Sequence, residues 1–187
     1  MDTKRLIVGV SGSSAPQLAY KLLQTLATRD DVETHLVLTR GAELSIKLEM
    51  GMSAGEFEAL ADVVHDASNL GASISSGSFT TCGMVIMPCS MKTLAAIASG
   101  VSADLVARAA DVCLKERRRL VLVTRETPLN LIHIRNMETV TLAGATVLPP
   151  VPAFYHKPRT IDDLLAQTTG KVLDQFGIEH NLFQRWT

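Results

Sequence analysis

The sequence predicts an α/β protein in which a mostly parallel β-sheet is covered by helices on both faces. Two observations carry this prediction. Short apolar, β-branched runs recur along the chain, and several are apolar at nearly every position, as in strands buried on both faces. Helical patterns lie between these runs, and strands that alternate with helices form parallel sheets. No linker, repeat or low-complexity tract interrupts the chain, so we expect one domain over residues 1–187.

Five runs are expected to be strands. They are RLIVGV (5–10), ETHLVLT (33–39), GMVIMP (83–88), RLVLVT (119–124) and ATVLPP (145–150). Three segments carry helical patterns, and two of them begin or end at a typical capping residue. They are 16–27, 102–118 with Ser102 as N-cap, and 160–177 between Thr160 and Gly177. The Pro-rich segment 148–158 is interpreted as a rigid crossing loop, because a helix and a tail follow it.

The composition limits the classes of function. Apolar residues make up 47% of the chain, yet no run approaches the roughly 18 to 20 apolar residues of a membrane span, so we expect a core and a subunit interface. The net charge of −1 gives no basic field that would hold nucleic acid. The N-terminal sequence lacks a signal-peptide layout, and Cys82, Cys89 and Cys113 lack C-x-x-C spacing. We therefore expect a cytoplasmic protein without a disulfide framework.

Polar residues follow the predicted strands at the edge where such sheets bind ligands. Ser11-Gly12-Ser13-Ser14 follows the first strand and Thr39-Arg40 the second. The stretches CSMKT (89–93) and RETPL (125–129) follow the third and fourth. Hydroxyls, cations and a carboxylate are thus expected to converge on one edge of the sheet.

The first loop predicts a site for one terminal phosphate. It matches neither G-x-x-x-x-G-K-[ST] nor G-x-G-x-x-G, and no acidic residue ends the second strand to bind a ribose. Short hydroxyls and backbone N–H groups at a helix N-terminus suit a mononucleotide such as FMN. A plain turn with serine N-caps explains the first loop equally well. In the second loop Ser90 can cap the next helix, with Lys92 and Thr93 in its first turn, and capping alone also explains it. Two such loops at adjacent strand ends favour a ligand.

Other reactive residue types are interpreted structurally. Cys89 closes an apolar strand and lacks a basic partner, so we expect a buried thiol rather than a nucleophile. The five histidines show no H-x-x-x-H or H-E-x-x-H spacing, so we assign no metal. Arg108 and Lys115 lie seven residues apart on one predicted helix face and could reach a second anion.

Several stretches of the sequence closely resemble those of one family, the UbiX-type or Pad-type flavin prenyltransferases. The resemblance lies in GVSGSS, SISSGSF, MPCSMKTLAAIASG, RAADVCLKERRRLVLVTRETPL, PPVPAFYHKP and the closing LDQFGIEHNLFQRW. It implies a flavodoxin-like sheet in a homododecamer built from trimers. It also implies transfer of a dimethylallyl group from dimethylallyl phosphate to N5 and then C6 of reduced FMN. The product, prenylated FMN, is the cofactor of UbiD-type decarboxylases.

The resemblance also assigns roles to individual positions. The carboxylates implicated in proton handling match Glu49 and Glu126. Contacts to the prenyl donor match Lys115, Arg125, Tyr155 and the position of Lys171. Contacts to FMN match Gly12, Ser13, Ser14, Thr39, Ser90, Met91, Lys92, Thr93 and Arg125.

The residues themselves are compatible with this chemistry. Cations and a phenol around the leaving phosphate would stabilise its charge, and Glu126 beside Arg125 can act as general acid and later as base. The lack of a D-D-x-x-D motif fits a monophosphate donor without Mg²⁺. Two positions depart from the family pattern. Ala15 stands where glycine is usual, and Lys171 stands where many relatives carry arginine. Lysine keeps the positive charge but cannot bind a phosphate with the bidentate geometry of arginine.

Two other functions are possible on this sequence. The chain could be an FMN-binding or flavin-delivery subunit of a decarboxylase system, without transfer of its own. It could also be a flavoprotein decarboxylase of the cysteine-decarboxylase type. That chemistry would favour a histidine near the first loop and a PASANT-like stretch, and neither is present.

Overall fold

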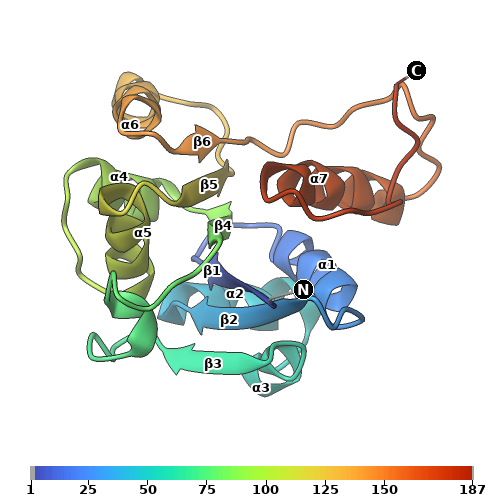
Figure 1. Ribbon diagram of the computed structural model, residues 1–187. Helices are drawn as coiled ribbons and strands as arrows, with labels where there is room; N and C mark the ends of the chain where they lie inside the picture. The colour runs from blue at the N-terminus through green and yellow to red at the C-terminus, as the bar shows by residue number, and fades with distance from the viewer. Residues whose placement is uncertain (1–2, 187) are drawn as a thin grey trace.

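The computed structural model describes residues 3–186, which form a six-stranded parallel sheet with helices on both faces (Figure 1). The strands lie in the order β3-β2-β1-β4-β5-β6. The chain adds β2 and β3 on one side of β1 and β4, β5 and β6 on the other, so the winding of the sheet changes side between β1 and β4. This arrangement confirms the predicted α/β fold. The strands are β1 (Lys4–Val10), β2 (Val32–Leu38), β3 (Val63–Asp66), β4 (Gly83–Cys89), β5 (Arg119–Thr124) and β6 (Thr146–Val147).

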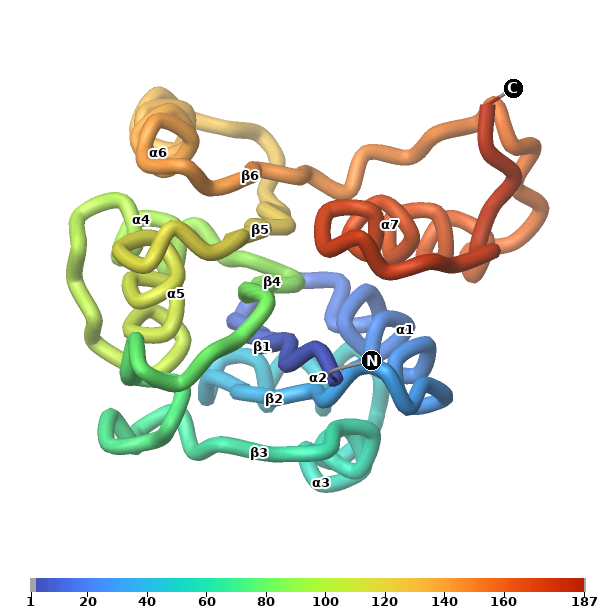
Figure 2. Tube along the Cα trace, viewed as in Figure 1, coloured from blue at the N-terminus to red at the C-terminus, as the bar shows by residue number. Residues whose placement is uncertain are grey.

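Two apolar cores fill the space between the sheet and its helices. One core joins the sheet to α1, α2, α3 and α7, and Figure 2 shows α1 and α7 side by side. The other joins the opposite face to α4, α5 and α6. The helices are α1 (Gln17–Leu26), α2 (Arg40–Met50), α3 (Ala54–Glu58), α4 (Met91–Ala98), α5 (Leu105–Lys115), α6 (Leu131–Leu142) and α7 (Ile161–Gln175), with a short 3₁₀ turn η1 (Ser73–Ser75). None of these helices is long and apolar enough to cross a bilayer.

The structure differs from the sequence prediction at several boundaries. The strand expected over 145–150 is reduced to two residues, because Pro149 and Pro150 have no N–H to donate to a ladder. The helix expected over 102–118 begins instead after Asp104, whose carboxylate accepts a hydrogen bond from Ala107 N–H at 2.9 Å. Ser102 was therefore the wrong N-cap. Thr160 caps α7 as predicted.

Four elements were not predicted from the sequence. The strand β3 has only four residues, and two of them are His65 and Asp66. The helices α2, α3 and α6 bury few of their side chains, so their apolar periodicity is weak. These elements matter for function because α2 and the end of β3 border the site.

Candidate active site

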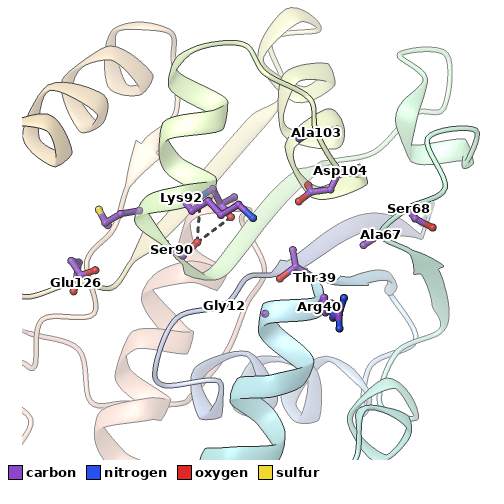
Figure 3. A pocket seen from close by; sticks show the side chains of 13 residues that line it. Gly12, Thr39, Arg40, Ala67, Ser68, Ser90, Lys92, Ala103, Asp104 and Glu126 are labelled. Carbon is purple, nitrogen blue, oxygen red and sulfur yellow. Dashed lines mark hydrogen bonds between the residues drawn. The ribbon is translucent and has the colours of Figure 1, made fainter.

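The two hydroxyl-bearing loops border a cleft of about 550 Å³ at the carboxyl edge of the sheet. The cleft lies at the reversal between β1 and β4, where doubly wound sheets bind ligands. Figure 3 shows Ser90 and Lys92 in its centre, between Glu126 on one side and Arg40 on the other. The lining residues are Gly12, Thr39, Arg40, Gly41, Ala67, Ser68, Ser90, Met91, Lys92, Thr93, Ala103, Asp104 and Glu126.

Three helices begin at this cleft, α2, α4 and α5, and the first two have hydroxyl N-caps. Thr39 is the N-cap of α2, and its hydroxyl accepts a hydrogen bond from Ala42 N–H at 3.2 Å. Ser90 caps α4 in the same way, accepting from Thr93 N–H at 3.2 Å. The first turn of a helix carries N–H groups without helical partners and the positive end of the helix dipole, which together favour an anion. Lys92, exposed in the first turn of α4, adds a full positive charge.

Ser11 joins the two loops. Its hydroxyl donates to Pro88 O at 3.0 Å and accepts from Ser90 N–H at 2.8 Å. The loop after β1 and the loop after β4 are therefore held at a fixed spacing.

The first loop also approaches α2 closely at a pair of glycines. A Cβ on Gly12 would lie 2.9 Å from Gly41 Cα, and one on Gly41 would lie 3.0 Å from Gly12 Cα. Neither position accepts a side chain without a shift of the backbone. The bare backbone and capped helix N-termini here fit the phosphate and ribityl chain of a mononucleotide.

A second hydrogen-bond network lies beside Gly12 and joins the first loop to Arg125 and Glu49. Ser13 Oγ donates to Arg125 O at 2.8 Å, and Ser14 Oγ donates to Glu49 Oε2 at 3.1 Å. The same Glu49 oxygen accepts from Ala15 N–H at 3.0 Å. Ala15 has a φ of +72°, a left-handed conformation that favours glycine. The Glu49 carboxylate thus holds a strained turn in place, and it does so from the last turn of α2.

Arg125 and Glu126 follow β5 at the same edge. Arg125 N–H donates to Cys89 O at 3.2 Å, which continues the pairing of β4 and β5 beyond the strands. Glu126 lines the cleft, and one of its carboxylate oxygens accepts from Thr127 N–H at 3.1 Å. The backbone thus places a carboxylate beside the cleft with its second oxygen available.

Cys89 is fully buried, and burial raises the pKa of its thiol to about 12. Such a thiol is not ionised at neutral pH and is a poor nucleophile. This agrees with the structural interpretation made from the sequence. Among the described residues no group of three or more histidine, cysteine or acidic side chains could hold a metal ion.

Seven of the predicted site residues do not line this cleft. Four of them, Ser13, Ser14, Glu49 and Arg125, form the network beside it, and three lie elsewhere on the chain. Tyr155 lines a second cavity of about 270 Å³ with His156, Lys157, Gln184, Arg185 and Trp186. Both ring nitrogens of His156 are buried without a hydrogen-bond partner among residues 3–186. Lys171 lies on α7 with its amine 3.6 Å from Asp174 Oδ2. In Figure 1, α7 and the C-terminal segment lie on the opposite side of the molecule from α4 and α5.

Lys115 is the third residue that lies elsewhere. It ends α5 and pairs with Glu116, whereas Asp104, at the start of the same helix, lines the cleft. The eleven residues of α5 span about 16 Å at 1.5 Å per residue. Lys115 of one chain therefore does not reach the cleft of that chain.

Sequence reasoning missed part of the lining. Ala67 and Ser68 follow β3, the short strand that was not predicted. Ala103 and Asp104 lie at the start of α5, two residues after the expected cap. A search for acidic N-caps could have found Asp104, but nothing in the sequence marked Ala67 or Ala103.

Comparisons with known proteins agree on one family. A family model described as flavoprotein matches residues 1–173. The flavin prenyltransferase UbiX of Salmonella typhimurium is 55% identical over 185 residues, which is 98% of each chain. A crystal structure of AnUbiX in complex with FMN and dimethylallyl pyrophosphate superposes with a TM-score of 0.96 and 51% identity, covering 99% of this chain and 98% of the other. A dodecameric FMN-dependent Ubix-like decarboxylase from Escherichia coli has a TM-score of 0.96 and 50% identity, covering 98% and 99% of the two chains.

Proposed function

The chain belongs to the UbiX family of flavin prenyltransferases, and on this premise we propose that it transfers a dimethylallyl group from dimethylallyl phosphate to reduced FMN. The observation that carries the proposal is the cleft where α2 and α4 begin, lined by Thr39, Ser90 and Thr93. A related enzyme of similar size binds FMN and dimethylallyl pyrophosphate. The monophosphate is the donor that the family resemblance implies, and the experiment below compares it with the pyrophosphate.

FMN would be held mainly by the two loops. The N–H groups of the first turns of α2 and α4, with the Lys92 amine, would bind its phosphate. Gly12 and Gly41 leave room for close approach of the flavin chain. Ser13, Ser14 and Arg125 support the first loop through their hydrogen bonds, and Met91 and Thr93 line the cleft. When bound, reduced FMN supplies N5 and C6 as the nucleophiles that attack the allyl group.

The chain's own residues would manage charge and protons. The C–O bond of the prenyl donor breaks and phosphate leaves with the bonding electrons, so cations near it lower the barrier. Glu126, at the cleft with one free carboxylate oxygen, would give a proton to the leaving phosphate and later take one from the flavin ring. Glu49 would assist proton handling through the Ser14 hydroxyl that it contacts.

The residues assigned to the prenyl donor argue for an assembled site. Lys115, Tyr155 and Lys171 are not among the residues lining the cleft of their own chain. We infer that neighbouring copies supply some of them in a dodecamer like that of the Escherichia coli relative. The α6 side chains Leu131, Ile132, Ile134 and Leu142 are exposed apolar surface that such contacts would bury.

The product implies a recipient. Prenylated FMN would pass to a UbiD-type decarboxylase, and the chain itself would decarboxylate nothing. We place the reaction in the cytoplasm, where Cys82, Cys89 and Cys113 would stay reduced, as their unpaired state requires.

One experiment tests the transfer. The protein is incubated anaerobically with reduced FMN and dimethylallyl phosphate. It is then denatured, and the mass of the released flavin is measured by mass spectrometry. Gain of one dimethylallyl group is expected. Unchanged flavin that stays bound would indicate a delivery subunit. In a separate incubation with FMN and a peptide that ends in cysteine, loss of CO₂ from the peptide would indicate a decarboxylase. A parallel reaction with dimethylallyl pyrophosphate decides between the two prenyl donors.

A further inference from the structure

Asp174, near the end of α7, anchors the C-terminal segment, residues 178–186. Its carboxylate accepts two hydrogen bonds from the Arg185 guanidinium, 2.7 Å to Oδ1 and 3.2 Å to Oδ2. It also accepts one from His180 Nε2 at 3.2 Å. A planar guanidinium that meets both oxygens of a carboxylate is fixed in orientation as well as in position.

The residues around the Asp174–Arg185 ion pair hold the C-terminal segment against α7. Leu182 N–H donates to His180 Nδ1 at 3.3 Å, so the proton of the neutral imidazole lies on Nε2 and points to Asp174. A Cβ on Gly170 would lie 2.5 Å from both His180 Cε1 and Phe183 Cε1, so the segment packs on bare helix backbone. Burial by itself would raise the pKa of Asp174, but hydrogen bonds from Arg185 and His180 outweigh it and hold that pKa below the ordinary carboxyl value.

The anchor determines the position of the next residue, Trp186. The Trp186 ring stands edge-on to Tyr155, with 5.7 Å between ring centroids and 84° between ring planes. Trp186 is 80% exposed, so packing alone restrains it weakly. Its place against Tyr155 therefore depends on the adjoining Arg185. Both rings line the 270 Å³ cavity, together with the Arg185 and Lys157 cations.

We propose that Asp174 is a positioning residue for the prenyl donor: by fixing Arg185 it holds Trp186 against Tyr155 and so keeps one wall of this cavity in place. The inference rests on the proposed function, which assigns Tyr155 to the prenyl donor. A cavity that combines two cations, a phenol and an indole suits a phosphate ester with a small branched alkenyl tail. Asp174 acts on Trp186 and Tyr155 through Arg185, and its Oδ2 also lies 3.6 Å from the amine of Lys171, a second residue assigned to the prenyl donor.

The first test measures the anchor without any substrate. Trp186 is the only tryptophan of the chain, so its fluorescence reports on this segment alone. In the wild type the time-resolved anisotropy of the indole should decay mainly with tumbling of the whole protein. Asp174→Asn keeps the size of the side chain and removes its charge, and it should add a fast local decay. The matched control is Asp162→Asn, which removes the ion pair with Lys21 at the other end of α7 and should leave the decay unchanged.

The second test measures binding of dimethylallyl phosphate by calorimetry to the FMN-loaded protein. Asp174→Asn should weaken this binding about 10- to 100-fold, the scale of a misplaced binding group, while the affinity for FMN stays the same. In turnover the KM for the prenyl donor should rise by a similar factor and kcat should change much less. Arg185→Gln also removes a cation from the cavity, so it should weaken binding at least as much as Asp174→Asn. Adding Asp174→Asn to Arg185→Gln should change the affinity little further.

The outcomes separate this inference from the proposed function. If Asp174→Asn and Arg185→Gln bind dimethylallyl phosphate as the wild type does, or leave the Trp186 anisotropy unchanged, the positioning role is refuted. If the wild type binds dimethylallyl phosphate in an Asp174-dependent way but transfers nothing to reduced FMN, the proposed transfer fails and the positioning role stands.

Discussion

Ala15 offers a direct test of how the first loop is built. Its φ of +72° is left-handed, and Glu49 holds its N–H with a 3.0 Å hydrogen bond. A glycine at this position would keep the N–H and remove the steric conflict between Cβ and the backbone. We predict that Ala15→Gly raises the stability of the protein and leaves FMN binding intact.

The expected magnitude is small and follows from three opposing contributions. Left-handed backbone costs a non-glycine residue about 1–2 kcal/mol. A glycine loses more freedom on folding, which costs about 0.5–1 kcal/mol. The Ala15 methyl is half-buried against the first core, and its loss costs about 0.4 kcal/mol, half the value of a buried methylene. The net gain is about 0.5 kcal/mol, which for a chain of this size raises Tm by about 1–2 °C.

The matched control is Ala27→Gly, the same atomic change at the C-cap of α1. Ala27 is exposed, and its φ of −60° lies in the right-handed region, so glycine there brings only the entropic cost. Thermal unfolding of both variants, at one protein concentration and without FMN, should place Ala15→Gly about 1 kcal/mol above Ala27→Gly. If Ala15→Gly unfolds at or below the temperature of Ala27→Gly, Ala15 is not strained and the reasoning is wrong.

Three further predictions concern the site. Ser14→Glu places a second carboxylate against Glu49, 3.1 Å from the present hydroxyl, so flavin absorbance should be lost after gel filtration; full retention would count against the FMN site. Glu126→Gln should retain FMN but slow single-turnover transfer by roughly 10²–10⁴-fold; weaker FMN binding with a normal rate at saturation would show that Glu126 only supports Arg125. Burial raises the pKa of Cys89 and Cys113 to about 12, so iodoacetamide at pH 8 should label neither thiol in the folded protein and both after unfolding, as peptide mapping would show.

Continuous apolar runs made the central strands of the sheet predictable. The strands β1, β2, β4 and β5 are buried at nearly every position, and their sequences are apolar to match. The strand β3 lies at the sheet edge with an alternating, half-exposed pattern over four residues, which is too short for a reliable signal. The helix α6 buries Val140 and packs Met137 partly against the core, whereas Leu131, Ile132, Ile134 and Leu142 are exposed. Its apolar residues therefore form no one-sided pattern in the sequence.

The loops of the candidate site were predictable for a different reason. The residues after β1, β2 and β4 are short hydroxyls and glycines, and the parallel topology brings them to one edge whatever the exact boundaries of the strands. A spacing of seven residues predicts a shared helix face, but it does not say which of the two residues lies near the ligand. Arg108 and Lys115 share a face of α5, but Arg108 binds Asp111 and Ser75 O, and Lys115 lies at the far end from the cleft.

The separation of the two cavities has a consequence for the chemistry. The cleft holds the groups suited to a flavin phosphate, and the C-terminal cavity holds groups suited to a second phosphate ester. Transfer of an allyl group requires the reacting carbon of the prenyl donor to lie about 3–3.5 Å from the flavin atom that attacks it. The two cavities share no lining residue within one chain, so on the proposed assignment of the prenyl donor we expect another copy to bring its cavity to the cleft. Assembly would then be a condition of catalysis, and a variant that dissociates the oligomer should keep FMN binding while losing transfer.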